Sequence, residues 1–322
     1  MNNKAYVKLL TNGMYDIQEV RKAVENRITM FSKSEDEETA EVANELQVII
    51  AKKLRDTEDS MADQIAEHVK DIPITKWLNE VRGIGPRLSG SLIGIIGDLP
   101  DNISQLWSYC GMATIPVCES CAKLSDTKSK SSKTHKKTQK IAYQGEARII
   151  FCRKQADRRW EQHSRQKEDS KIENEEDFKE KAYNDTEAKL CQCENPVIVN
   201  VATHPRLFKG LLLTYNPFLK MTCWKVSGQF VKQGSYYRKV YEQAKARYQK
   251  NESLTKMHIE NRARRYTVKL FLSHLHEMWS KSEGREVNEF YYKQYGDFSG
   301  HHYIPPPYND IYDEVTIPMA AD

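Results

Sequence analysis

Four of the seven cysteines occur in two close pairs, a spacing that is typical of metal-binding thiolates. Two residues separate Cys118 from Cys121, and one residue separates Cys191 from Cys193. Together the pairs supply the four sulfur ligands of a tetrahedral zinc ion. Because they stand at the two ends of a long polar segment, a shared zinc ion would close that segment at its base. The alternative is four reduced thiols with no joint role.

Residues 81–98, VRGIGPRLSGSLIGIIGD, follow an amphipathic segment and have the form of a helix-hairpin-helix. The glycines allow a tight turn and a close approach to a phosphate, while the isoleucine between them is expected to point inward. Pro86 suits the first turn of a helix, whose free N–H groups can bind a phosphate oxygen. The expected phosphate-binding residues are Arg82, Gly83, Ile84, Gly85 and Arg87. An ordinary corner between two helices is the alternative.

The segment 256–282 predicts a second basic surface, on a long helix. Arg262, Arg265 and Lys269 recur at i, i+3 and i+7, with Arg264 beside them, whereas the opposite face is apolar. One face therefore packs into a core, and the other is a candidate contact with DNA phosphates. A solvated charged face is the alternative.

Three segments, residues 81–112, 216–248 and 258–279, together resemble the C-terminal domain of the IS-one-ten (Piv/MooV-like) transposase family. They cover roughly half of the chain. The resemblance implies binding to DNA, with a serine of this domain attacking DNA beside a RuvC-like N-terminal domain that carries four acidic ligands for Mg²⁺. The first 70 residues here contain no alternating strands to present such carboxylates, and resemble the helical connector between the family's two domains.

The position aligned with the family's nucleophilic serine is occupied by Gln229. Ser227 lies two residues earlier, which on a helix is a rotation of about 200°. Ser227 is therefore the candidate nucleophile that the resemblance offers, with a helix-surface hydroxyl as the alternative. Mg²⁺ would be required only if the chain were catalytic.

The elements that position these residues are expected to be mostly α-helical. The regions are a helical connector or coiled coil (1–72), a helix-hairpin-helix (73–116), an inserted Lys-rich and Cys-containing segment that binds zinc or is loop-rich (117–204), a helical transposase-like core (205–285) and an extended tail (286–322). Within the insertion, 126–140 is a predicted mobile loop, and 143–165 and 178–190 are predicted helices. In the core, a helix over 219–249 is interrupted near Gly234, and a second covers 256–282.

The N-terminal 72 residues repeat apolar side chains at helical spacing around a charged stretch at 33–39. That stretch indicates either a break into an antiparallel pair or a single rod. The helices then either join copies of the chain into a homo-oligomer or fold onto their own domain.

Composition narrows the class of protein. Of the 322 residues, 39% are hydrophobic and 29% charged, and the net charge is +4, so binding to nucleic acid must come from local basic clusters. No apolar run approaches the roughly 20 residues of a membrane span, and residues 1–30 lack the apolar stretch that is typical of a signal peptide. We expect a cytoplasmic protein, nucleoid-associated in a prokaryote or encoded by a mobile element or virus.

Three functions compete. The leading hypothesis is a transposase-like protein that binds duplex or branched DNA without cutting it, with RNA as a further candidate partner. The second is a shortened serine transposase or recombinase of a mobile element. The third is a zinc-stabilised scaffold in which the hairpin is only a corner.

Overall fold

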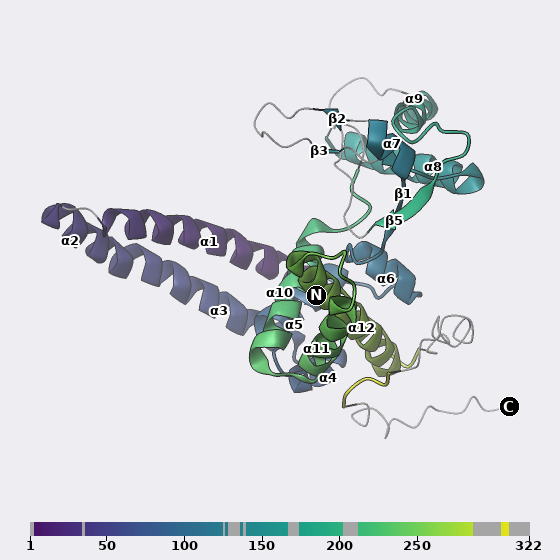
Figure 1. The fold of residues 1–322 in the computed structure, drawn as a ribbon. Helices are drawn as coiled ribbons and strands as arrows, with labels where there is room; N and C mark the ends of the chain where they lie inside the picture. Colours follow the sequence, from purple (N-terminus) through teal and green to yellow (C-terminus); the bar gives the residue numbers. More distant parts are fainter. Residues whose placement is uncertain are drawn as a thin grey trace. The chain divides into compact units, whose positions relative to one another are not determined.

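The computed structural model describes residues 3–33, 36–124, 126–127, 136–137, 140–166, 174–201, 212–285 and 304–308. Two compact units make up the chain, one formed by residues 1–110 and 217–322 and the other by 111–216. Helices dominate both units, which confirms the predicted mostly α fold (Figure 1). The side chains of the Lys-rich run at 123–139, and the tail apart from 304–308, lie outside the described residues. No helix of the described ranges combines the length and the apolar character needed to cross a bilayer.

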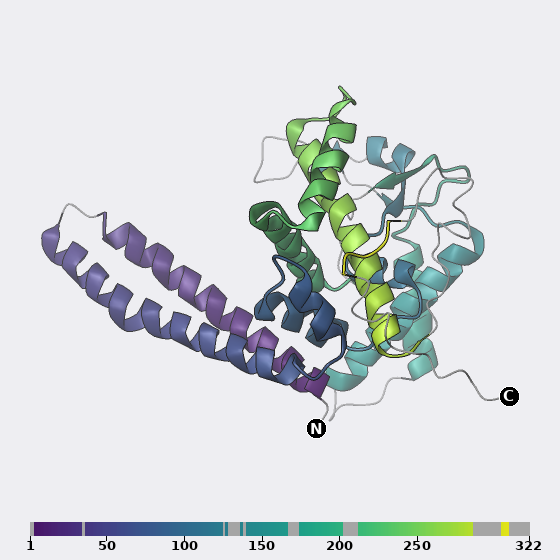
Figure 2. The same cartoon turned by 90° about the horizontal axis from the view of Figure 1, so that it is seen from below.

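A helical hairpin opens the first unit. Helices α1 (Asn3–Phe31) and α3 (Lys52–Val69) pack side by side, and α2 (Glu37–Leu46) and the π-helical turn η1 (Gln47–Ala51) lead from one to the other. Figures 1 and 2 show the pair extending from the other helices of this unit. Asp36 caps α2 by accepting the N–H of Thr39 at 3.1 Å. The charged stretch therefore breaks the helix into an antiparallel pair, one of the two predicted arrangements.

The base of this hairpin packs on α5 (Pro86–Ile96), which follows α4 (Ile74–Glu80). Small residues make the approach close: a Cβ atom added at Gly94 would lie 2.9 Å from the backbone nitrogen of Lys8. The fully buried carboxylate of Glu58, on α3, pairs with Arg21 of α1 and lies 3.6 Å from Nη1 of Arg87 on α5. Apolar packing and this ion-pair network together hold the three helices.

The rest of the first unit contains α6 (Ile103–Tyr109), α10 (Pro217–Gln233), α11 (Tyr236–Gln249) and α12 (Lys256–Ser282). The predicted interruption near Gly234 is confirmed, because α10 ends there and Gly234 adopts φ +62°. His274 accepts the Tyr237 hydroxyl at Nδ1 (2.9 Å) and donates from Nε2 to the carbonyl of Ile304 (2.9 Å). Burial lowers the pKa of His274 to about 4, so the imidazole is neutral and fixes the short segment 304–308 against α12.

The second unit is built on a small sheet. Strand β1 (Ile115–Cys118) lies between β4 (Lys140–Ile141) and β5 (Ile198–Val201) and is antiparallel to both. The short strands β2 (Asp126–Thr127) and β3 (Lys136–Lys137) form a separate antiparallel pair. Its helices are α7 (Glu119–Leu124), α8 (Gly145–Gln166) and α9 (Glu175–Glu187), and the last two confirm the helices predicted in the insertion. The sheet was not predicted, because strands of two to four residues carry too little alternation to be recognised.

Candidate metal centre and nucleic-acid interface

The four paired cysteines come together at one end of the three-stranded sheet. Cys118 ends β1, Cys121 follows within α7, and Cys191 and Cys193 lie in the loop after α9. All four Sγ atoms lie within 4.8 Å of one another. Cys191 is placed by its N–H, which donates to the carbonyl of Ile141 at 3.0 Å, next to the edge of the sheet. Cysteines some 70 residues apart in sequence thus share one cluster.

The sulfur separations suit a tetrahedral ion. The Sγ atom of Cys121 lies 3.4 Å from that of Cys191 and 3.6 Å from that of Cys193, and Cys118 lies 3.9 Å from Cys193. A zinc–sulfur distance of about 2.3 Å implies a sulfur–sulfur edge of about 3.8 Å, whereas a disulfide requires about 2.05 Å. The four thiols could therefore hold a metal ion such as zinc.

Local hydrogen bonds favour a thiolate at one corner of the cluster. The N–H of Cys121 donates to Sγ of Cys118 at 3.4 Å, the contact that a Cys-x-x-Cys turn makes with its first sulfur. Although burial raises the pKa of Cys118, this N–H and the three neighbouring thiols lower it to about 7. Burial raises the pKa of Cys191. The backbone N–H of Cys193 and the thiol of Cys121 lower it, whereas the thiols of Cys118 and Cys193 raise it. A divalent cation would reverse this effect, because it stabilises every thiolate that it binds.

The predicted hairpin joins α4 to α5. Gly83 has φ +100°, a conformation that favours glycine, and a Cβ atom there would lie 3.4 Å from the backbone carbonyl of Gln229 on α10. Ile84 is buried at 5% exposure, as expected of the inward-pointing residue. Gly85 is exposed, and a Cβ atom added to it would meet nothing within 4 Å. The turn therefore has one side on α10 and the other open to solvent.

Donor groups line the open side of the turn. Within the described part of the chain, the N–H groups of Gly85 and Arg87 donate to no acceptor, whereas those of Leu88 and Ser89 bond to the carbonyl of Gly85. The Arg82 side chain is exposed. Arg87, the other predicted arginine, instead pairs with Asp59 and with Glu58 on α3. Of the two arginines, Arg82 is the one that the structure presents to solvent beside free N–H groups.

One turn of α10 connects the hairpin to the basic helix. Gln229 lies against Gly83, while Ser227, two residues away, faces α12, as expected for an unbroken helix. The Ser227 hydroxyl is 1% exposed; it donates to the carbonyl of Trp224 at 2.8 Å and accepts from Nε of Arg264 at 3.0 Å. A backbone carbonyl cannot remove the proton of an attacking hydroxyl at neutral pH, so neither of these two contacts activates Ser227 as a nucleophile.

The predicted basic residues of α12 divide into an exposed and a partly buried group. Arg262 is exposed, whereas Arg265 and Lys269 are half-buried, and Arg265 lies close enough to Lys220 of α10 to affect its charge. Burial lowers the pKa of Lys269, and the charge of Arg265 lowers it further; Lys220 is affected in the same way. The Nζ atom of Lys269 also lies 3.8 Å from the ring centroid of Trp107 on α6. Sequence reasoning missed Lys220 and Trp107, because neither is close in sequence to the Arg-rich stretch.

No protein-family model, curated protein or solved structure matches the chain.

Proposed function

We propose that the chain binds the DNA backbone through the hairpin at residues 82–87 and the basic residues of α12, without cutting the strand. The observation that carries the proposal is the open side of the hairpin, where two free N–H groups at the start of an 11-residue helix stand beside the exposed Arg82. Such a helix start attracts anions through its unpaired N–H groups and its dipole. The resemblance to the IS-one-ten transposase domain favours DNA as the source of the phosphate.

The α12 cations extend this surface within the same unit. Arg264 reaches the α10 turn that supports the hairpin, since its Nη2 atom lies 3.1 Å from a Cβ atom placed on Gly228. Burial lowers the pKa of Lys220 and of Lys269, and the charge of Arg265 lowers both further; a phosphate bound beside these cations would relieve the repulsion from Arg265. These contacts reach the backbone and not the base edges, so the affinity should depend little on DNA sequence.

A titration with fluorescent duplexes tests this proposal against its two competitors. We expect two duplexes of unrelated sequence and equal length to bind with similar affinity, and Mg²⁺-containing reactions to show neither a nick nor a protein–DNA adduct on denaturing gels. The expectation follows from the backbone contacts and from the buried, carbonyl-bonded hydroxyl of Ser227. An adduct that disappears in Ser227→Ala would support the serine transposase, and no binding at low salt would support the scaffold.

We further propose that the cysteine cluster holds a structural zinc ion. Among the described residues, four thiols alone make up the cluster, a ligand set that matches closed structural sites, in which no position is open to substrate or water. The ion would fasten the loop after α9 to the end of β1, so that the two ends of the insertion are joined.

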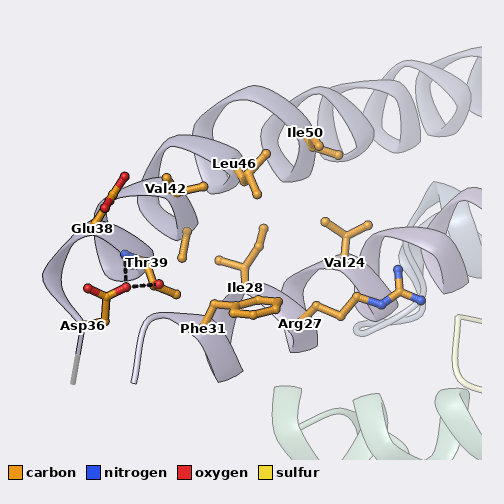
Figure 3. A pocket seen from close by; sticks show the side chains of 11 residues that line it. Val24, Arg27, Ile28, Phe31, Asp36, Glu38, Thr39, Val42, Leu46 and Ile50 are labelled. Carbon is orange, nitrogen blue, oxygen red and sulfur yellow. Dashed lines mark hydrogen bonds between the residues drawn. The ribbon is translucent and has the colours of Figure 1, made fainter. Parts of the chain in front are cut away.

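Finally, we propose that the N-terminal hairpin joins two copies of the chain. Its far end contains a groove of about 530 Å³ between α1 and the α2–η1 segment (Figure 3). Figure 3 shows Val24 and Ile28 of α1 facing Leu46 and Ile50 across the groove. Phe31 also lines the groove and is 56% exposed, so part of the apolar lining is open to solvent.

A second copy suits this groove because its rim carries both charges. Arg27 lies on the α1 side, and Asp36 and Glu38 lie on the α2 side. In a two-fold dimer, the α1 side of the groove in one copy can face the α2 side of the groove in the partner. Arg27 of each copy would then lie opposite an acidic group of the other copy. Exposed apolar patches of this kind mark protein–protein contacts more often than free surface.

Sedimentation velocity tests self-association. We expect the wild-type protein to be dimeric at micromolar concentration and Leu46→Glu to be monomeric, because a buried unpaired carboxylate opposes the contact. Leu9→Glu is the control, since Leu9 is 70% exposed on α1 but does not line the groove. A monomeric wild-type protein, or equal dimerisation of both variants, would contradict the proposal.

A further inference from the structure

A second hollow, of about 430 Å³, lies between α11, α12 and the segment 304–308. One face of α11 supplies most of its wall, with side chains at i, i+3, i+4, i+7, i+8 and i+11. Tyr266 of α12 and Ile304 complete it. Ile304 is held there by the bond from its carbonyl to His274. The lining residues are Tyr236, Lys239, Val240, Gln243, Ala244, Arg247, Tyr266 and Ile304.

The lining combines flat rings with positive charge. Tyr236 is 37% exposed, in contrast to its buried neighbour Tyr237, which belongs to the core. The guanidinium of Arg247 stacks on the ring of Tyr266, with 4.8 Å between Cζ and the ring centroid. Lys239 is exposed and adds a second cation. Helical spacing thus fixes one ring and two cations on the α11 wall, and Tyr266 adds a second ring from α12.

Among the described residues, no carboxylate lines this hollow. Two acids of these helices are engaged in ion pairs: Glu242 accepts from Arg238 at 2.8 Å, and Glu260 accepts from Lys245 at 3.0 Å. An anionic ligand would therefore meet no repulsion inside the hollow. Rings for stacking, cations for phosphate and the amide of Gln243 for a base edge are the groups with which proteins bind single-stranded nucleotides.

We propose that this hollow binds one unstacked nucleotide of single-stranded DNA, with the base on Tyr236 or Tyr266 and the phosphate near Lys239 and Arg247. Its volume falls within the range of small-ligand sites, and a mononucleotide fits that size. The choice of DNA rests on the proposed function, but the hollow uses different residues from the hairpin. The chain would then hold a duplex at the hairpin and an opened strand at α11.

Fluorescence anisotropy with a short single-stranded oligonucleotide, competed by dAMP, tests the proposal. We expect Tyr236→Leu and Lys239→Ala each to weaken single-strand binding roughly tenfold, while duplex binding stays unchanged. Arg238→Ala is the matched control, because Arg238 lies on the same helix, pairs with Glu242 and does not line the hollow. Thermal melts establish that every variant is folded.

The outcomes separate this inference from the proposed function. The nucleotide site would be overturned if Tyr236→Leu and Lys239→Ala both bind single strands as tightly as the wild-type protein. It would also be overturned if Arg238→Ala weakens that binding to the same extent. If the wild-type protein does not bind duplex DNA but Tyr236→Leu still abolishes single-strand binding, the nucleotide site in the hollow would be supported and duplex binding at the hairpin would be rejected.

Discussion

Replacing Cys191 with serine is expected to abolish metal binding and to unfold the sheet of the second unit. A serine hydroxyl is a poor zinc ligand, and three thiolates hold the ion far less firmly than four. Structural zinc sites contribute an apparent free energy of about 10–16 kcal/mol, which exceeds the stability of most small domains. The loop after α9 would then lose its attachment to Cys118 at the end of β1.

Metal analysis and limited proteolysis measure this effect. The wild-type protein, purified under reducing conditions, should contain about one zinc ion per chain, and Cys191→Ser should contain none and be cleaved rapidly within residues 111–216. Cys152→Ser is the matched control, because Cys152 is buried in the same unit but lies outside the cluster. Metal-free wild-type protein that resists proteolysis would remove zinc from the account.

Placing a branched side chain on the open side of the hairpin is expected to weaken DNA binding without loss of stability. Gly85 has φ −96° and ψ 179°, an extended conformation that valine adopts readily, and a Cβ atom there meets nothing within 4 Å. Gly85→Val should therefore fold normally while its methyl groups keep phosphate away from the N–H groups of Gly85 and Arg87. Loss of charged hydrogen bonds of this kind costs about 1.5–3 kcal/mol, which corresponds to a roughly ten- to hundredfold weaker affinity.

The control for this substitution is Asn79→Val, which adds the same side chain to the exposed surface of α4 outside the turn. Gly83 cannot serve as the test position, because a side chain at φ +100° strains the backbone against Gln229. Equal affinities of Gly85→Val and Asn79→Val would show that the hairpin is not in the interface.

Much of this architecture could be predicted from sequence, where the signal was local. Helical spacing located α8 to α12, Gly234 marked a break, and the pair spacing of the cysteines identified a cluster that only the fold assembles. The hairpin was predicted from Gly83, Gly85 and Pro86, whose conformational preferences act within a few residues. Such local preferences carry over directly from sequence to structure.

Contacts between distant segments could not be predicted in this way. Arg87 was expected at a phosphate, yet it pairs with Glu58 and Asp59, because α3 packs beside α5. Lys220 and Trp107 lie beside Arg265 and Lys269 only after three helices have packed together. The partial burial of this basic face depends on the same packing, and helix periodicity contains no information about it.

The salt dependence of duplex binding shows whether the hairpin binds the DNA backbone. Each phosphate that a cation neutralises adds about one to the slope of log Kd against log salt concentration. Arg82→Ala should lower that slope by about one, whereas Lys53→Ala, which removes an equal charge from exposed α3, should leave it unchanged. A slope near zero for the wild-type protein, or the same slope for both variants, would contradict the account.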